Sequence, residues 1–207
     1  MPFLLIHGLG QTPEAWEETR RLLPLSDVHC PDLIHLLDGA PAEYSTLYQA
    51  FAAYSDALPQ PRHLCGLALG GVLALQYAAE HPARVASLVL IGTPYRIPHR
   101  MLALQSAIFR LLPKCAFRQM GFSKADVLRL SGSMAALDPA GFLPAVSCPT
   151  LILCGGKDHT NRVAAQEIAA ALPRACLQII PGAGHEANRD APAQLALALA
   201  RFRNTHS

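Results

Sequence analysis

Three glycine-rich segments of the chain carry residues whose types suit acyl transfer. Ala68 stands within Gly66-Leu67-Ala68-Leu69-Gly70, Asp158 follows Gly155-Gly156-Lys157, and His185 follows Gly182-Ala183-Gly184. Hydrolysis through an acyl-enzyme needs a nucleophile, a base, a group that orients the base, and N–H donors for the oxyanion. An imidazole that titrates near neutral pH and a carboxylate are suited to two of these tasks.

The elements that must position these segments follow from the hydrophobic pattern. Short apolar runs alternate with helical periodicity, which predicts βα units around a parallel sheet. We expect strands over residues 2–6, 27–30, 62–65, 85–91, 150–154 and 176–180. Helices are expected over 13–23, with Thr12 as N-cap, and over 45–58, 70–80 and 189–203. Each glycine-rich segment therefore follows a predicted strand.

These segments, in this order, resemble the motifs of the α/β-hydrolase family. The resemblance rests on His7-Gly8-Leu9-Gly10, the Gly66–Gly71 elbow, Gly155-Gly156-Lys157-Asp158, and Gly182-Ala183-Gly184-His185-Glu186. The family order of oxyanion loop, nucleophile, acid and histidine is kept over nearly the whole chain. The resemblance implies an α/β fold: a three-layer sandwich with a mostly parallel sheet of about six strands. It also implies a single domain over residues 1–207, opening on what resembles the family's third strand.

The resemblance assigns a role to each matching residue. His185 corresponds to the catalytic base, and Asp158 to the acid that accepts its N–H and stabilises the imidazolium. The alternative for His185 is a structural loop histidine. The alternative for Asp158 is the N-terminal aspartate of a helix, with Asp138 or Asp32 as substitute acids.

The oxyanion donors are expected to come from the backbone. Leu9 follows His7-Gly8 and Leu69 follows the nucleophile position, so their N–H groups are the candidates. We expect His7 to hold the loop by hydrogen bonding. Trp16 is a candidate substrate-binding residue, although a lone tryptophan on an amphipathic helix is more often a core residue.

Ala68 departs from the family pattern, because a methyl group cannot attack a carbonyl. Ser45, Ser55 and Ser87 lie in other predicted elements, and Cys65 lies inside the strand that precedes the elbow. Either alanine replaces an original serine, or the protein has no nucleophile by nature. We favour the first explanation, since the elbow glycines, acid, histidine and oxyanion loop are all present.

The alternation of strands and helices breaks between Pro94 and Pro149. We interpret residues 95–148 as a helical cap inserted in the domain. Its apolar residues either pack as ordinary helices or form a lid over a substrate, and they are Met101, Leu102, Ile108, Phe109, Leu111, Leu112, Phe117, Met120 and Phe122.

Composition restricts the classes of partner. The chain has 207 residues, of which 51% are hydrophobic and 15% charged, with a formal net charge of +2. Its basic residues are scattered, which argues against nucleic acid, and no run of ~20 apolar residues predicts a membrane span. Six cysteines without a C-x-x-C pair indicate reduced thiols and a cytoplasmic protein. We expect no metal and no organic cofactor.

We therefore expect the scaffold of a serine hydrolase that cleaves carboxylic esters of small, mostly apolar or aromatic groups through an acyl-enzyme. The chain as it stands would be inactive because of Ala68. Two alternatives are a non-catalytic protein that binds a small molecule, and an enzyme that uses only the His–Asp pair. The scaffold does not choose between esters, amides, lactones, thioesters and carbon–carbon bonds.

Overall fold

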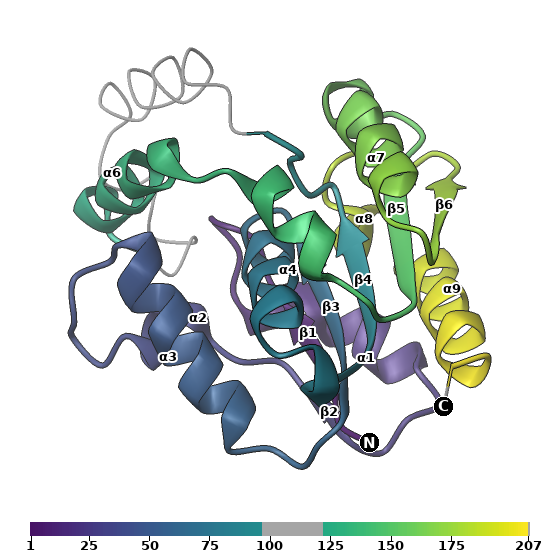
Figure 1. The fold of residues 1–207 in the computed structure, drawn as a ribbon, viewed down its shortest axis with the longest axis horizontal. Helices are drawn as coiled ribbons and strands as arrows, with labels where there is room; N and C mark the ends of the chain where they lie inside the picture. Colours follow the sequence, from purple (N-terminus) through teal and green to yellow (C-terminus); the bar gives the residue numbers. More distant parts are fainter. Residues whose placement is uncertain (97–121, 207) are drawn as a thin grey trace.

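A six-stranded sheet forms the centre of the computed structural model, which describes residues 1–96 and 122–206. The strand order is β2-β1-β3-β4-β5-β6, and every neighbouring pair is parallel (Figure 1). The strands are β1 (Phe3–Ile6), β2 (Val28–His29), β3 (Arg62–Leu67), β4 (Val85–Ile91), β5 (Thr150–Gly155) and β6 (Ala175–Ile180). The predicted parallel sheet of about six strands is confirmed.

Helices cover both faces of this sheet and make it a three-layer sandwich. Successive strand residues point to opposite faces, so Leu4 and Ile6 belong to one core cluster and Phe3 and Leu5 to another. The first cluster includes residues of α3 (Tyr44–Asp56), α4 (Leu69–Glu80) and α7 (His159–Ala171). The second includes residues of α9 (Pro192–Asn204), which packs on α1 (Glu17–Leu22).

The helix boundaries differ from the predicted ones where proline intervenes. The helix expected over 189–203 is divided into α8 (Ala187–Asp190) and α9, because Pro192 lacks an N–H and begins a new helix. The helix expected over 13–23 begins as the 3₁₀ turn η1 (Pro13–Trp16) before α1. Thr12 occupies its N-cap position without a side-chain hydrogen bond. Short α2 (Leu33–Leu36) and η2 (Pro82–Arg84) complete this part.

The described part of the predicted cap packs on the main body of the protein. It contains α6 (Lys124–Ser133), η4 (Met134–Ala136) and η5 (Pro139–Ala145). Phe122, Val127 and Leu143 are buried in the same cluster as α3 and α4, as expected of ordinary helical packing. The lid function stays a prediction. The other cap residues lie outside the described part of the chain: Met101, Leu102, Ile108, Phe109, Leu111, Leu112, Phe117 and Met120.

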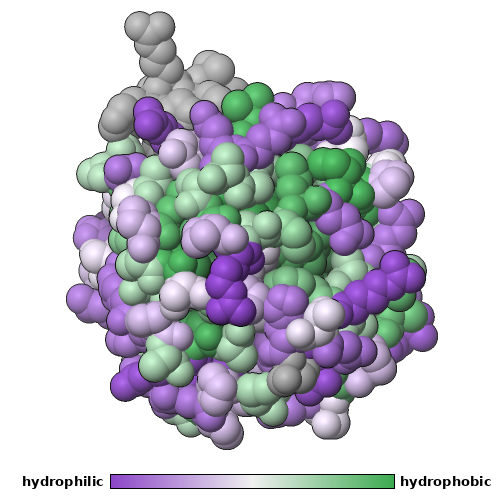
Figure 2. Space-filling model, turned by 45° about the vertical axis from the view of Figure 1, so that its right-hand side comes forward, coloured by the Kyte–Doolittle hydropathy of each residue, from purple (hydrophilic) through white to green (hydrophobic). Residues whose placement is uncertain are grey.

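Hydrophobic and hydrophilic residues are mixed on the side of the molecule that carries α7, β6 and α9 (Figure 2). Three large apolar side chains on these elements are exposed: Val163, Ile179 and Leu197. They belong to three different elements, and scattered apolar residues of this kind are normal on a protein surface. Within residues 1–96 and 122–206, none of the helices has the length and apolar character that a membrane crossing requires.

Candidate active site

Ala68 occupies a sharp turn between β3 and α4. Its φ of 49° and ψ of −110° are unusual for any residue other than glycine. The turn is crowded: a Cβ atom on Gly70 would lie 2.3 Å from the Ile6 carbonyl oxygen of β1. The predicted elbow is therefore formed with alanine at its apex, in a conformation that costs free energy.

The ends of neighbouring strands bring the glycine-rich segments together around Ala68. The Ala68 N–H donates to the Ile91 carbonyl at 2.9 Å, so Ala68 lies beside Gly92, the residue after β4. A Cβ atom on Gly92 would lie 2.8 Å from His185 Nδ1, and one on Gly8 would lie 3.6 Å from the Ala68 methyl. His185 and the His7-Gly8-Leu9 loop thus approach the elbow from different sides.

His185 and Asp158 form a hydrogen-bonded pair. His185 Nδ1 lies 3.0 Å from Asp158 Oδ2; the aspartate side chain is 4% exposed and the histidine side chain 43%. Donation from Nδ1–H to the carboxylate leaves Nε2 free to accept a proton, which is the tautomer that a general base needs. The β5–β6 pairing brings the two loops together, and Lys157 N–H donates to the Ala183 carbonyl at 2.8 Å.

Asp158 is also the N-cap of α7, which is the alternative interpretation of this residue. Its Oδ1 accepts from the Asn161 backbone N–H at 3.2 Å. The Asn161 side-chain Nδ2 lies 2.9 Å from both carboxylate oxygens and 3.1 Å from His185 Nδ1. Neither substitute acid contacts His185: Asp32 caps α2, and Asp138 stands before η5.

No sequence motif indicates Asn161 as a neighbour of His185. The only local signal is its position three residues after Asp158, where a helix-capping partner would stand. Its contact with His185 joins residues 24 positions apart, which a local pattern does not reveal. Asn161 therefore contacts both members of the His185–Asp158 pair.

The Leu9 and Leu69 N–H groups are the candidate donors for an oxyanion. Leu69 is the first residue of α4, where backbone N–H groups lack intrahelical partners. Neither N–H makes a hydrogen bond within the described residues. The Gly8 carbonyl, in the same peptide group as the Leu9 N–H, accepts from His7 Nδ1 at 2.9 Å and Gln11 N–H at 3.2 Å. A trans peptide directs the N–H away from its carbonyl.

His7 has the loop-holding contacts expected of it. The ring is buried, and its Nε2 accepts from the Leu33 N–H at 3.2 Å while Nδ1 donates to Gly8. Burial lowers the pKa of His7, which favours the neutral ring that this pair of hydrogen bonds requires. Both ring nitrogens of His7 therefore hold the loop by hydrogen bonding, and neither is available to act as a base.

Of the remaining candidates, Ser45 is exposed on α3 and the others lie in the core. Trp16 is completely buried in the cluster with Phe3 and Leu5, which favours its core interpretation over a substrate contact. Cys65 is buried inside β3, and burial raises the pKa of its thiol well above the physiological range. Ser55 and Ser87 are buried and bonded to Arg62 and His63 respectively.

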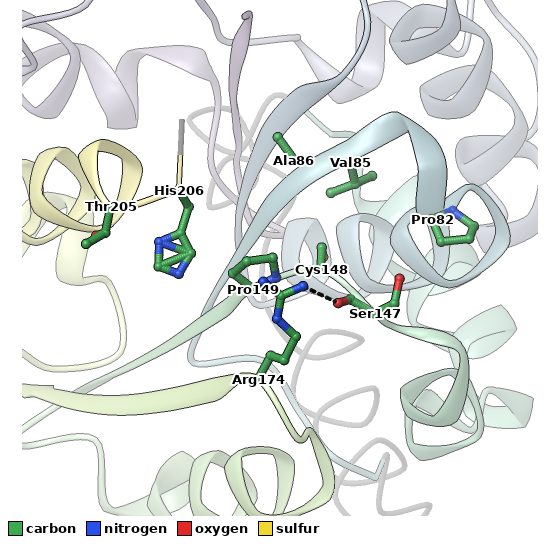
Figure 3. Close-up of a pocket in the computed structure, with 9 residues that line it drawn as sticks. All are labelled: Pro82, Val85, Ala86, Ser147, Cys148, Pro149, Arg174, Thr205 and His206. Carbon is green, nitrogen blue, oxygen red and sulfur yellow. Dashed lines mark hydrogen bonds between the residues drawn. The ribbon is translucent and has the colours of Figure 1, made fainter.

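A cavity of about 440 Å³ lies at the opposite end of the sheet (Figure 3). Its lining includes Val85 at the start of β4, Pro149 before β5 and Arg174 before β6. Ligands of parallel α/β sheets bind at the carboxyl ends of the strands, so this cavity is separate from the candidate site. In the part of the chain that the structure describes, no group of three His, Cys, Asp or Glu residues could hold a metal ion.

Comparison with known proteins identifies the family. A pimeloyl-[acyl-carrier protein] methyl ester esterase of Aromatoleum aromaticum is 42% identical in an alignment of 95 residues. This alignment covers 44% of this chain and 36% of that protein. A Chromobacterium violaceum protein of the same name is 30% identical in an alignment of 162 residues, which covers 61% of this chain and 64% of that protein. Each match spans less than two thirds of the relative.

A structural neighbour shows the same fold over the whole chain. A thermophilic esterase from Thermogutta terrifontis superposes with a TM-score of 0.75 at 22% identity, covering 100% of this chain and 91% of that one. The model of the alpha/beta hydrolase family matches residues 3–198. This protein belongs to the α/β-hydrolase family.

Proposed function

We propose that this chain is the scaffold of a carboxylic-ester hydrolase in which alanine has replaced the nucleophilic serine at position 68. The observation that carries the proposal is the backbone of Ala68. A φ of 49° is unfavourable for alanine and gives a methyl group no function. The same turn would present a serine hydroxyl at the apex of the elbow, beside the Gly92 backbone on which the His185 ring lies.

The chemistry follows from the side chains around the elbow. A serine Oγ at position 68 would attack the ester carbonyl while His185 Nε2 takes its proton. Asp158 would stabilise the imidazolium, and the Leu9 and Leu69 N–H groups would stabilise the oxyanion. Collapse of the tetrahedral intermediate releases the alcohol with the proton from His185. Water, deprotonated by His185, then attacks the acyl-enzyme. His185 returns the proton to the serine Oγ as the acyl–oxygen bond breaks and the carboxylic acid leaves.

Ester substrates are supported by the names of the two relatives described above, which are methyl ester esterases. We infer that the substrate is a small molecule whose acyl or alcohol group is mostly apolar or aromatic. A cytoplasmic location is supported by the free state of the five described cysteines: Cys30, Cys65, Cys148, Cys154 and Cys176.

The test compares this chain with its Ala68→Ser variant on a panel of p-nitrophenyl and methyl esters with acyl chains of increasing length. We expect serine to raise kcat/KM by a factor on the order of 10⁴ to 10⁶, the range lost when triad members are removed. His185→Ala in the serine background should return the rate to that of the alanine protein.

Two outcomes would replace the proposal. Turnover by the Ala68 chain that is lost on His185→Ala would identify an enzyme that needs only the His–Asp pair. An Ala68→Ser variant that folds but cleaves no ester, combined with ligand-induced thermal stabilisation of the Ala68 chain, would identify a binding protein.

A further inference from the structure

Two buried side-chain amides connect the loop that begins at His7 to α8, the helix that follows His185. Gln11 Nε2 donates to Asn188 Oδ1 at 3.3 Å, and Asn188 Nδ2 donates back to Gln11 Oε1 at 3.2 Å. Each residue is only 1% exposed, although they stand 177 positions apart. A reciprocal pair of this kind satisfies polar groups that would otherwise be buried without partners. We call it the amide pair.

On the Gln11 side, the amide pair reaches Gly8, the residue whose carbonyl belongs to the peptide that carries the Leu9 N–H. Gln11 Oε1 also accepts from the Gly8 N–H at 3.4 Å, and the Gln11 N–H donates to the Gly8 carbonyl at 3.2 Å. Gln11 thus holds Gly8 at both its amide and its carbonyl. Rotation of the Gly8–Leu9 peptide would break the bond from the Gln11 N–H to the Gly8 carbonyl and would redirect the Leu9 N–H. The bond from the Gly8 N–H to Gln11 Oε1 holds the preceding peptide.

On the Asn188 side, the amide pair is connected through α8 to Gly184, the residue before His185. Asn188 lies on α8, three residues after His185. Asp190, on the same helix, accepts from the Gly184 N–H at 2.6 Å, which fastens the residue before His185 to α8. The Asn188 carbonyl also accepts from Thr19 Oγ1 of α1 at 3.5 Å. Hydrogen bonds therefore connect Gly8 with Gly184 through one short helix.

We propose that Gln11 and Asn188 are positioning residues that set the Leu9 oxyanion donor relative to His185. The inference rests on the proposed function, because it assigns catalytic value to the distance between these two groups. An oxyanion donor stabilises the transition state more than the bound substrate. Loss of the amide pair should therefore lower kcat and leave KM nearly unchanged.

The kinetic test uses the Ala68→Ser background with Gln11→Ala, Asn188→Leu and the double variant. We expect each single variant to lower kcat by about 10- to 100-fold, somewhat less than removal of a whole donor. The double variant should be no slower than the slower single one, because both changes break the same connection. The matched control is Gln76→Ala. It removes a side-chain amide of α4 that is bonded to Tyr44 and Glu80, and kcat should stay at the value of the Ala68→Ser parent.

Asn188→Asp separates positioning from folding. The protonated acid can donate to Gln11 Oε1 and accept from Gln11 Nε2, whereas the carboxylate can only accept. Its kcat relative to the Ala68→Ser parent should therefore fall as pH rises from 5 to 8. The ratio for Asn188→Leu should not change with pH. An Asn188→Asp ratio that does not change with pH would overturn the proposal.

Amide hydrogen exchange tests the amide pair without any catalysis. In the Ala68 chain, Asn188→Leu should raise the exchange rate of the Gly8 N–H at least about tenfold, and Gln76→Ala should not. Unchanged exchange at Gly8 would refute the proposal even if Ala68→Ser is active. Faster exchange of the Gly8 N–H, combined with an inert Ala68→Ser variant, would support the structural role of the amide pair and would reject only the proposed esterase function. Faster exchange with unchanged kcat would reject the positioning role.

Discussion

Replacement of Gly92 by alanine should lower kcat/KM, because the added Cβ atom displaces the His185 ring. A Cβ atom there would lie 2.8 Å from His185 Nδ1, 2.9 Å from Cε1 and 3.4 Å from Asp158 Oδ2. Ordinary carbon contacts begin near 3.4 Å, so the imidazole must move by roughly 0.6 Å or more. The ring is 43% exposed and is free to move outward, away from the carboxylate 3.0 Å away.

The expected loss follows from this displacement. Misplacement of a catalytic group by about 1 Å costs on the order of 10²-fold in rate. We therefore expect Gly92→Ala, in the Ala68→Ser background, to lower kcat/KM for the preferred ester by about 30- to 100-fold. Loss of the aspartate contact altogether would set an upper limit of about 10⁴-fold.

A matched glycine separates the steric clash from backbone strain. Gly39 has a φ of +80°, compared with +52° for Gly92, and a Cβ atom there meets nothing within 4 Å. Both variants should lose about 1 kcal/mol of unfolding free energy, measured by urea denaturation, because alanine disfavours a positive φ. Only Gly92→Ala should lose activity. An equal loss of activity in both variants would refute the placement of His185 against Gly92. A kcat/KM of Gly92→Ala within threefold of its parent would refute it as well.

Two further predictions concern stability. Ala68→Gly should raise the unfolding free energy by about 1 kcal/mol in urea denaturation, because glycine relieves the strain at a φ of 49°; an unchanged or lower value would contradict the strained elbow. His63 is fully buried and bonded to Ser87, and burial lowers its pKa from 6.5 to about 4. As pH falls, His63 therefore becomes protonated in the unfolded chain at a higher pH than in the folded chain. The unfolding free energy should decline by roughly 3 kcal/mol between pH 6.5 and 4 and stay level below pH 4. The His63→Gln variant should lack this decline. A difference in unfolding free energy between the two proteins that stays constant from pH 6.5 to 4 would contradict the prediction.

Local patterns predicted the strands more closely than the helix ends. Buried parallel strands are continuous apolar runs, so β4 (Val85–Ile91) begins and ends at its predicted residues. Helix ends depend on capping and packing, which is why the predicted 189–203 helix is divided at Pro192. The helix α7, capped by Asp158, did not appear among the predicted elements, although its cap residue was recognised as a helix-start candidate.

The sequence by itself determined the motif order and the types of the central residues. Glycines 66 and 70, Asp158 and His185 follow apolar runs, and parallel strands direct their carboxyl ends to one edge of the sheet. Only the tertiary structure decided which further polar groups meet there. Asn161 reaches His185, and Gln11 reaches Asn188 across 177 positions. Such contacts have no sequence period, because they depend on how the chain packs after the strands are ordered.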